Sequence, residues 1–174
     1  MSHFFSVNSN MIQTTIMDCP IGKLLLAQSN KGLTHILFEY EISKSESIIK
    51  RKFPQSTIVR EERALSHAVQ QINEYFSRKR QSFDLSLELV MPPFHYKALM
   101  AVKNIPYGKT QSYQYVAACA GNAKASRAAG SANANNPLPI VIPCHRVLAT
   151  GGGLGGYGGG LKMKNYLLNL EGAL

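Results

Sequence analysis

The chain has 174 residues, 45% of them apolar, which is enough to bury a hydrophobic core in one domain or two small ones. No apolar run approaches the roughly 20 residues of a membrane span, and the first residues lack the basic and apolar regions of a secretory signal. Three widely spaced cysteines favour free thiols in a reducing compartment over a disulfide framework. Two of them, Cys19 and Cys119, are expected to be buried and inert.

The net charge of +9 is concentrated in the second half of the chain. Residues 1–91 carry 11 Lys/Arg against 9 Asp/Glu, whereas residues 92–174 carry 8 Lys/Arg against a single acid, Glu171. A basic half joined to a nearly neutral half indicates a polyanionic partner, with nucleic acid as the leading candidate. The alternative is a basic surface that serves only solubility.

Residues 1–91 are predicted to form a small α/β unit, an antiparallel sheet covered by one helix. An apolar stripe with helical spacing predicts that helix over residues 61–78. Residues 40–60 are charged and weakly patterned, and we expect a connection there. Strands are predicted where β-branched and apolar residues gather between turn sequences or alternate with polar ones: 11–17, 22–28, 32–39 and 83–89.

Pro92-Pro93 marks the boundary of a second, helical domain over residues 92–174. Ser112 is placed to cap a helix, and Gly121-Asn122 forms a tight turn between two short helices, which predicts a helix-turn-helix. A glycine-dense loop, residues 151–160, comes before the last helix. The four helices are expected at residues 94–104, 113–120, 123–135 and 161–170.

The second helix of the helix-turn-helix consists almost entirely of small residues. Arg127 is its long exception, with Lys124 one turn earlier. Such a helix can press against a nucleic-acid groove with Arg127 inserted, as in proteins that take a base out of the stack. A tightly packed alanine-rich helix with Arg127 as a surface charge explains the composition equally well.

The stretch Ile142-Pro-Cys-His-Arg-Val147 places a thiol directly before two potential cations, which can hold it as a reactive thiolate. Sequence neighbours do not share a face of a regular element, so His145 can assist Cys144 only if the chain turns or a water bridges them. His145 could then draw off the thiol proton. Glu171 is the only acid in the basic half that could orient His145; a surface carboxylate at a frayed C-terminus is the alternative.

This stretch resembles the acceptor site of the O6-alkylguanine-DNA alkyltransferases. The resemblance covers most of residues 92–174 in the order and spacing of that family, whereas the first 90 residues agree only in coarse pattern. Five further stretches carry it: Ser112-Tyr-Gln, Ala125-Ser-Arg-Ala-Ala-Gly130, Asn136-Pro-Leu-Pro-Ile140, Gly156-Tyr-Gly-Gly-Gly-Leu161 and Leu167-Leu-Asn-Leu-Glu-Gly172.

The resemblance implies a role for each residue around the thiol. Cys144 would be the acceptor thiolate, His145 the base acting through a water, and Glu171 the carboxylate that orients His145. Asn136 would tie the helix-turn-helix to the active-site strand by hydrogen bonds. Arg146 would be buried and supportive rather than chemical.

The resemblance also implies how DNA and the base are held. The small residues would let the helix lie in the minor groove, Arg127 would fill the gap left by the flipped guanine, and Tyr113 would help turn the nucleotide out by its phosphate. The backbone around Val147 would read the exocyclic amine of the base. Further residues expected at the DNA are Ser112, Lys124, Ala125, Ala128 and Gly130, and the remaining pocket walls are Tyr157, Gly158 and Pro139.

Two departures from the family's pattern stand out. Gly158 occupies a position where many relatives carry a serine whose hydroxyl helps hold the alkylated oxygen, which predicts weaker lesion binding or a wider range of lesions. Some relatives bind zinc in the first domain, but here that domain has one cysteine and scattered histidines, so we expect no metal. No cofactor is expected either.

We therefore expect an α+β fold, with a small α/β domain over residues 1–91 and a winged helix-turn-helix-like domain over 92–174. The expected function is single-turnover repair of O6-alkylguanine, and of O4-methylthymine, in duplex DNA by irreversible transfer to Cys144. We expect a monomer that could cluster on DNA, has no membrane partner, and works in the cytoplasm, or in the nucleus of a eukaryote. Two alternatives are a lesion-binding protein that cannot accept the alkyl group, which would lack the cysteine, and a Cys/His hydrolase, which would need direct contact between its nucleophile and base.

Overall fold

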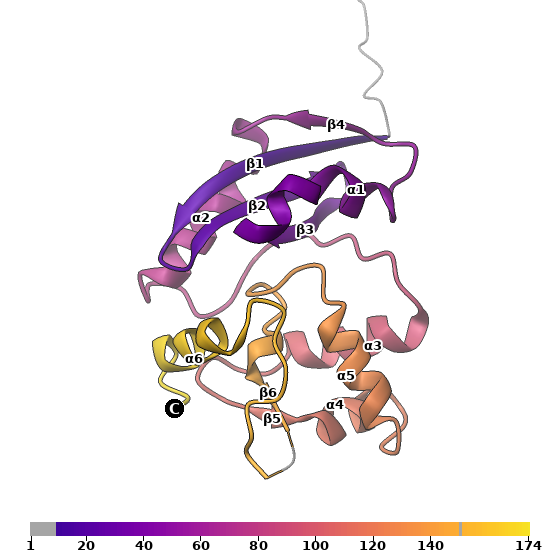
Figure 1. Ribbon diagram of the computed structural model, residues 1–174, viewed down its shortest axis with the longest axis vertical. Coiled ribbons are helices and arrows are strands. Elements are labelled where there is room, and N and C mark those ends of the chain that lie inside the picture. The colour runs from indigo at the N-terminus through magenta and orange to yellow at the C-terminus, as the bar shows by residue number, and fades with distance from the viewer. Residues whose placement is uncertain (1–9, 150) are drawn as a thin grey trace, which may run out of the picture.

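The structure is a computed structural model that describes residues 10–149 and 151–174. The first half of the chain forms a sheet with two helices, and the second half forms a separate helical layer beneath it (Figure 1). The expected α+β fold, a small sheet unit followed by a helical unit, is confirmed.

The sheet has four strands in the order β3-β2-β1-β4. The antiparallel meander that the turn sequences predict consists of β1 (Met11–Cys19), β2 (Gly22–Ser29) and β3 (Gly32–Phe38). The fourth strand, β4 (Thr57–Arg60), pairs with β1 in parallel. The interpretation of residues 40–60 as a connection is therefore wrong in part, because they contain β4, a 3₁₀ helix (Glu39–Lys44) and α1 (Ser45–Lys50).

The inner strand β2 is buried on both of its faces. Leu24 and Leu26 face the main core, which also takes in α2 (Ser66–Phe76) and the helical layer. Leu25 and Ala27 face a smaller core closed by Ile49 of α1. Alternate residues of a strand point to opposite faces, which explains the continuous apolar run of β2.

Two predicted elements of the first half differ from the structure. The helix predicted over residues 61–78 is a short 3₁₀ turn at Arg63–Leu65 followed by α2, which ends at Phe76. The strand predicted over residues 83–89 is an extended segment with one bridge, Leu33 to Leu87. The backbone hydrogen bonds between this segment and β3 do not continue beyond the bridge. The N–H of Ile36, further along β3, donates instead to the carbonyl of Pro137 at 2.8 Å.

The helical layer consists of α3 (Pro93–Lys103), α4 (Tyr113–Cys119), α5 (Ser126–Ala134) and α6 (Leu161–Leu170). A short parallel pair, β5 (Gln111–Ser112) and β6 (Val147–Leu148), joins the start of α4 to the segment after Cys144. Ser112 caps α4 as predicted, since its Oγ accepts the N–H of Tyr115 at 3.1 Å.

Helix α5 begins three residues later than predicted, and Lys124 and Ala125 therefore lie before it. The side-chain oxygen of Asn122 accepts the N–H of Lys124 at 3.1 Å, and its carbonyl accepts the N–H of Ala125 at 2.9 Å. An asparagine that bonds the backbone two residues on stabilises a turn in place of a helix.

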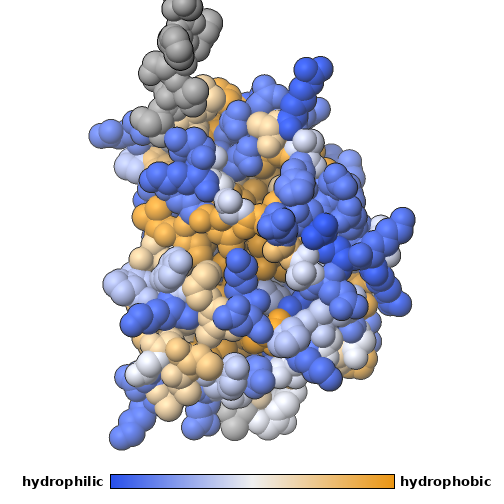
Figure 2. Space-filling view, turned by 180° about the vertical axis from the view of Figure 1, so that it is seen from behind, coloured by the Kyte–Doolittle hydropathy of each residue, from blue (hydrophilic) through white to orange (hydrophobic). Residues whose placement is uncertain are grey.

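One continuous hydrophobic core joins the two layers, so the halves pack as a single body. On the face turned away from the view of Figure 1, an apolar patch lies on one side of the molecule, bordered by hydrophilic regions (Figure 2). Cys19 is half-buried and Cys119 is exposed, so the expectation that both are buried is wrong. Within the described ranges, no helix combines the length and the apolar character needed to cross a membrane.

Candidate active site

The backbone makes a 3₁₀ turn at Cys144–Arg146, directly after Pro143. The loop before it is held by short-range hydrogen bonds, from the N–H of Ile142 to Leu138 and from that of Cys144 to Ile142, each 2.8 Å. Ile140 lies in this loop with φ of +75°, a conformation that costs free energy for a β-branched residue. The turn is the irregular backbone that a pairing of Cys144 with His145 requires.

The end of α5 fixes the loop in place through two asparagines. Asn136 donates its Nδ2 to the carbonyl of Ile142 at 2.8 Å, and its Oδ1 accepts the N–H of Leu138 at 3.0 Å. Asn133, in the last turn of α5, donates its Nδ2 to the carbonyl of Cys144 at 3.1 Å. The helix that carries Arg127 is thus bonded directly to the thiol-bearing turn.

Glu171, just beyond α6, is the centre of a buried network. Its Oε1 accepts from His145 Nε2 at 2.7 Å and from the hydroxyl of Tyr75 at 2.6 Å. Arg146 binds it in a fork, with Nε 2.8 Å from Oε2 and Nη2 3.0 Å from Oε1. The N–H of Gly108 donates to Oε2 at 3.3 Å.

These partners keep Glu171 ionised. Burial alone would raise the pKa of its carboxyl, but the hydrogen bonds and charges of His145 and Arg146 lower that pKa to about 2. An ionised carboxylate only accepts, so His145 must carry its proton on Nε2. Burial also lowers the pKa of His145, so the neutral ring leaves Nδ1 as a free base. Nδ1 has no hydrogen-bond partner among the described residues.

The Cys144 side chain is buried and, in the resting protein, is a thiol. Burial raises its pKa to about 11, although a hydrogen bond with Asn136 and the charge of Lys164 act in the opposite direction. A base nearby must therefore take the proton when the sulfur reacts. No hydrogen bond joins the ring of His145 to the sulfur in the described part of the chain, so a proton could pass between Sγ and Nδ1 only through a bridging water or after a movement of the side chains.

Like Asn133, Lys164 and Tyr75 contribute hydrogen bonds to the site but are absent from the sequence-based prediction. Lys164, fully buried in α6, donates its Nζ to the carbonyls of Val147 at 2.7 Å and of Leu154. Tyr75 reaches Glu171 from α2 in the first half of the chain. A signal for Lys164 was present, because it shares the apolar face of α6 with Leu167 and Leu168, at the spacing i, i+3, i+4.

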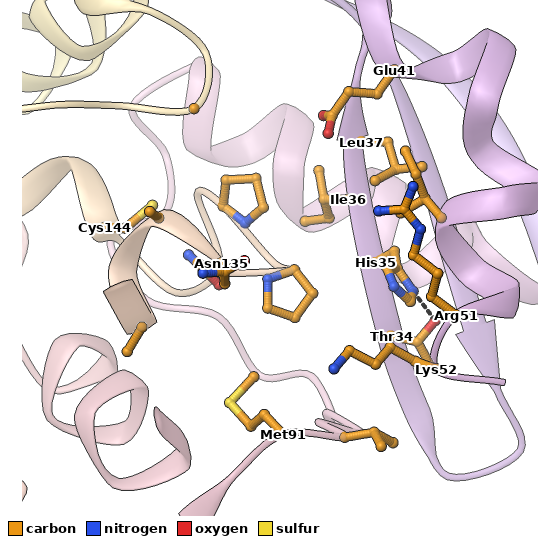
Figure 3. Close-up of a pocket in the computed structure, with 18 of the residues that line it drawn as sticks. Thr34, His35, Ile36, Leu37, Glu41, Arg51, Lys52, Met91, Asn135 and Cys144 are labelled. Atoms are coloured by element: carbon orange, nitrogen blue, oxygen red, sulfur yellow. Dashed lines mark hydrogen bonds between the residues drawn. The ribbon is translucent and has the colours of Figure 1, made fainter. Parts of the chain in front are cut away.

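A cavity of about 490 Å³ lies between the helical layer and the sheet, with Cys144 on one wall (Figure 3). Ile36, Leu37 and Glu41 lie on the opposite wall. Four other residues predicted for the site also line this cavity: Asn136, Pro139, Tyr157 and Gly158. Val147, which was predicted beside the base, does not line it.

The glycine-rich loop that forms one wall is tied to the sheet half. The hydroxyl of Tyr40 donates to the carbonyl of Gly158 at 2.6 Å. Phe38 stacks on Tyr40 and meets Tyr157 edge to face, with ring centres 6.1 and 6.0 Å apart. A Cβ added at Gly158 would meet nothing within 4 Å, so the missing side chain leaves open space at this wall.

The residues predicted to contact DNA surround α5 and the start of α4. Arg127 and Lys124 are exposed, whereas Ser112, Ala125 and Ala128 are half-buried. Tyr113 lies between α5 and the glycine-rich loop, since a Cβ on Gly130 would meet its ring at 3.9 Å and one on Gly155 its hydroxyl at 3.3 Å. The structure thus brings Tyr113, Cys144 and the loop together, with Arg127 on the outer face.

The arrangement provides an activatable thiol in the wall of a cavity, a histidine that can accept a proton, and a carboxylate that fixes its tautomer. Over residues 10–149 and 151–174, no group of three or more His, Cys, Asp and Glu side chains is placed to hold a metal ion.

Two family models match the chain nearly end to end. The model described as 6-O-methylguanine DNA methyltransferase, DNA binding domain, matches residues 93–173. The model described as 6-O-methylguanine DNA methyltransferase, ribonuclease-like domain, matches residues 12–89. The chain belongs to the 6-O-methylguanine DNA methyltransferase family.

Relatives within this methyltransferase family are similar over almost their whole length. The methylated-DNA–protein-cysteine methyltransferase of Methanosarcina acetivorans is 40% identical over 158 residues, which cover 91% of this chain and 97% of the relative. The constitutive enzyme of that name from Bacillus subtilis is 37% identical, covering 90% and 93%. The resemblance stated from the acceptor-site motif is therefore confirmed.

Solved structures of the same methyltransferase family have the same fold. The O6-methylguanine methyltransferase of Mycobacterium tuberculosis superimposes with a TM-score of 0.79 at 38% identity, covering 94% of both chains. A structure of the OGT protein of that organism in complex with DNA gives 0.79 at 36% identity, covering 94% of this chain and 93% of that one.

Proposed function

We propose that this protein repairs O6-alkylguanine in duplex DNA by moving the alkyl group onto the sulfur of Cys144. The observation that carries the proposal is the buried turn in which a cysteine lies on a cavity wall while the adjacent histidine is locked as the Nε2–H tautomer by Glu171. The names of the relatives, which describe transfer from methylated DNA to a protein cysteine, point to the same reaction.

The transfer is one displacement at the alkyl carbon. The sulfur of Cys144 forms a bond to that carbon while the bond from carbon to the O6 oxygen breaks, and the electron pair leaves with the guanine. The thiol proton passes through a water to His145 Nδ1 and is then available to the departing base. The product is a thioether, which no thiol exchange reverses, so each molecule acts once.

Cys144 is buried in the wall of a cavity, so a base in DNA that lies on the exposed face of α5 would have to leave the duplex to reach it. Arg127 projects from that face and would fill the space left in the stack, while Tyr113 would turn the nucleotide by its phosphate. The small residues of α5 allow close approach to the minor groove. DNA contacts of this kind carry little sequence information.

The chemistry of the acceptor supports a reducing compartment. A thiol that accepts an alkyl group must stay reduced, and we propose that the protein works in the cytoplasm, or in the nucleus of a eukaryote. One protein molecule is consumed per lesion, so we propose that a monomer carries out the transfer; clustering of copies on DNA adds nothing to the chemistry.

The direct test is to incubate the protein with a duplex that contains O6-methylguanine and to weigh its tryptic peptides. Cleavage after Arg127 and Arg146 releases residues 128–146 as one peptide containing Cys144. We expect that peptide to gain one methyl group as the lesion disappears. Loss of the lesion without methylation of this peptide, or no loss at all, would contradict the proposal.

The transfer rate should be independent of pH across the neutral range. Between the lowered pKa of His145 and the Cys144 pKa of about 11, thiol and ring together keep one transferable proton, so their total protonation does not change. Below the pKa of His145 its Nδ1 is protonated, and the rate should fall. Single-turnover rates from about pH 5 to about pH 9 measure this profile. A tenfold rise per pH unit above neutrality would instead indicate a thiolate formed without His145.

Arg127→Ala should slow repair of duplex DNA by about tenfold or more, because the flipped state loses the side chain that replaces the base in the stack. Transfer from free O6-benzylguanine, which needs no flipping, should change little. The matched control is Lys79→Ala, which removes an exposed cation from the other half of the chain. Equal losses on both substrates would show that Arg127 does not act on the duplex.

A further inference from the structure

A side-chain hydrogen bond joins the two walls of the cavity at its rim. Tyr40, in the 3₁₀ helix that follows β3, donates its hydroxyl to the carbonyl of Gly158 in the glycine-rich loop at 2.6 Å. Both residues line the cavity that holds Cys144. Tyr40 is nevertheless 62% exposed, so the contact lies where the cavity meets solvent.

The carbonyl of Gly158 is held by Tyr40 alone. Among the described residues Gly158 has no second hydrogen bond, and a Cβ added to it would meet nothing within 4 Å. The chain on either side is restrained by packing, of the Tyr157 ring on the core and of Gly159 against Met163. Glycine has more conformational freedom than any other residue, so the peptide at Gly158 depends on the Tyr40 hydroxyl for its position.

This part of the loop lies close to the reacting sulfur. Tyr157, the residue before Gly158, meets the ring of His145 edge to face, with ring centres 6.5 Å apart. Burial and the proximity of Cys144 raise the pKa of the Tyr157 hydroxyl. An alkyl group that moves to the sulfur must place its carbon against Cys144, and its other atoms must then fit between the sulfur and the surrounding walls.

Tyr40 is suited both to hold this wall and to release it. Burial and the charge of Glu41 raise the pKa of its hydroxyl, so at neutral pH the hydroxyl keeps the proton that it donates. Its ring stacks on Phe38, with ring centres 6.1 Å apart, which directs the side chain. Because Tyr40 is largely exposed, water competes with Gly158 as the acceptor, and the bond opens at a small net cost.

We propose that Tyr40 is a latch that limits the width of the cavity beside Cys144 and, through it, the size of the alkyl group that the protein accepts. Tyr40 acts through the Gly158 wall rather than on the reacting atoms, so it is a positioning residue. The inference rests on the proposed function, because it requires an alkylated base to enter the cavity. It gives the sheet half of the chain a part in the choice of lesion.

The test is Tyr40→Phe, which removes the hydroxyl and keeps the ring that stacks on Phe38. Single-turnover transfer is measured from two duplexes of one sequence, one with O6-methylguanine and one with O6-benzylguanine. The ratio of the benzyl rate to the methyl rate should rise about threefold or more, the scale of one hydrogen bond made in competition with water. Amide hydrogen exchange over residues 151–160 should become faster.

The matched control is Tyr166→Phe, which removes the hydroxyl of another exposed tyrosine, in α6, that does not line the cavity. It should change neither the ratio nor the exchange of the loop.

The outcomes separate a latch from a residue that only supports the fold. Equal changes on both duplexes in Tyr40→Phe would assign Tyr40 to the fold alone and overturn the inference. A fall in the ratio would also overturn it, because a released wall does not narrow the cavity. A raised ratio without faster exchange in the loop would place the effect elsewhere and reject the latch. Failure of the proposed function looks different, because the wild-type protein would then move no alkyl group to Cys144 from either duplex.

Discussion

Cys144→Ala is expected to abolish transfer while leaving binding to the lesion intact. The sulfur is the atom that forms the new bond, and no other described thiol lies on the cavity wall, since Cys19 is half-buried elsewhere and Cys119 is exposed. The substitution removes one buried atom and its hydrogen bond with Asn136, while the backbone bonds from Asn133 and Asn136 that hold the turn remain, so the fold should persist. Methyl transfer to protein and affinity for an O6-methylguanine duplex are the two measurements.

The matched control for this experiment is Cys119→Ala, which removes an exposed thiol and should leave the transfer rate unchanged. The pair of variants also separates the alternative functions. A protein that transfers in the absence of Cys144 would not use the proposed acceptor. A Cys144→Ala protein that no longer binds the lesion would show that the sulfur holds the turn rather than reacting.

Glu171→Gln should damage both the fold and the chemistry. It leaves the guanidinium of Arg146 buried without its counter-charge, which costs about 3–5 kcal/mol of unfolding free energy. It also replaces an oxygen that fixes the His145 tautomer with an amide that can donate, so the transfer rate should fall about a hundredfold or more. Chemical denaturation measures the loss of unfolding free energy. Single-turnover kinetics at low temperature measure the loss of transfer rate.

The pH dependence of stability provides an independent check on Glu171. Its pKa is lowered from 4.5 to about 2 in the folded state, so the stability it contributes is complete above the unfolded value and is lost as pH falls toward 2. The wild-type protein should lose stability over this interval more steeply than Glu171→Gln. Parallel curves of stability against pH for wild type and Glu171→Gln would contradict an ionised Glu171 in the folded protein.

Tyr75→Phe removes one neutral hydrogen-bond donor to Glu171. It should lower the single-turnover transfer rate less than tenfold.

The sequence predicts those elements whose apolar pattern is local. The three-strand meander, the capped start of α4 and the full range of α6 follow from periodicity and turn residues. Strand β4 does not, because it has four residues and pairs in parallel with β1, a contact that no local pattern encodes. Apolar and polar residues alternate over residues 83–89 because one face of this segment packs on the core. Such packing does not by itself produce the backbone hydrogen bonds of a strand, and only one bridge forms.

For the site, the sequence points to residues that belong to one continuous motif. It does not point to hydrogen-bond donors that come from distant parts of the chain. The single acid of the basic half leaves a surface carboxylate as an alternative, and the family resemblance is needed to propose Glu171 as the partner of His145. Tyr75 could not be found this way, because it joins Glu171 from a different half of the chain. Asn133 has no signal of its own, since an asparagine at a helix end is ordinary until the buried atoms around it are counted.

The hydrogen bonds that hold the glycine-rich loop have a consequence for the binding of a base in the cavity. Eight of its ten residues, 151–160, are glycines, which lose more conformational freedom on ordering than any other residue. Lys164 holds Leu154 from α6, and Tyr40 holds Gly158 from the sheet half. The entropy of ordering this wall is thus lost during folding, so under the proposed function it would not have to be lost when a base enters the cavity. Tyr40, in the sheet half, thus holds a wall of the candidate site that belongs to the other half of the chain.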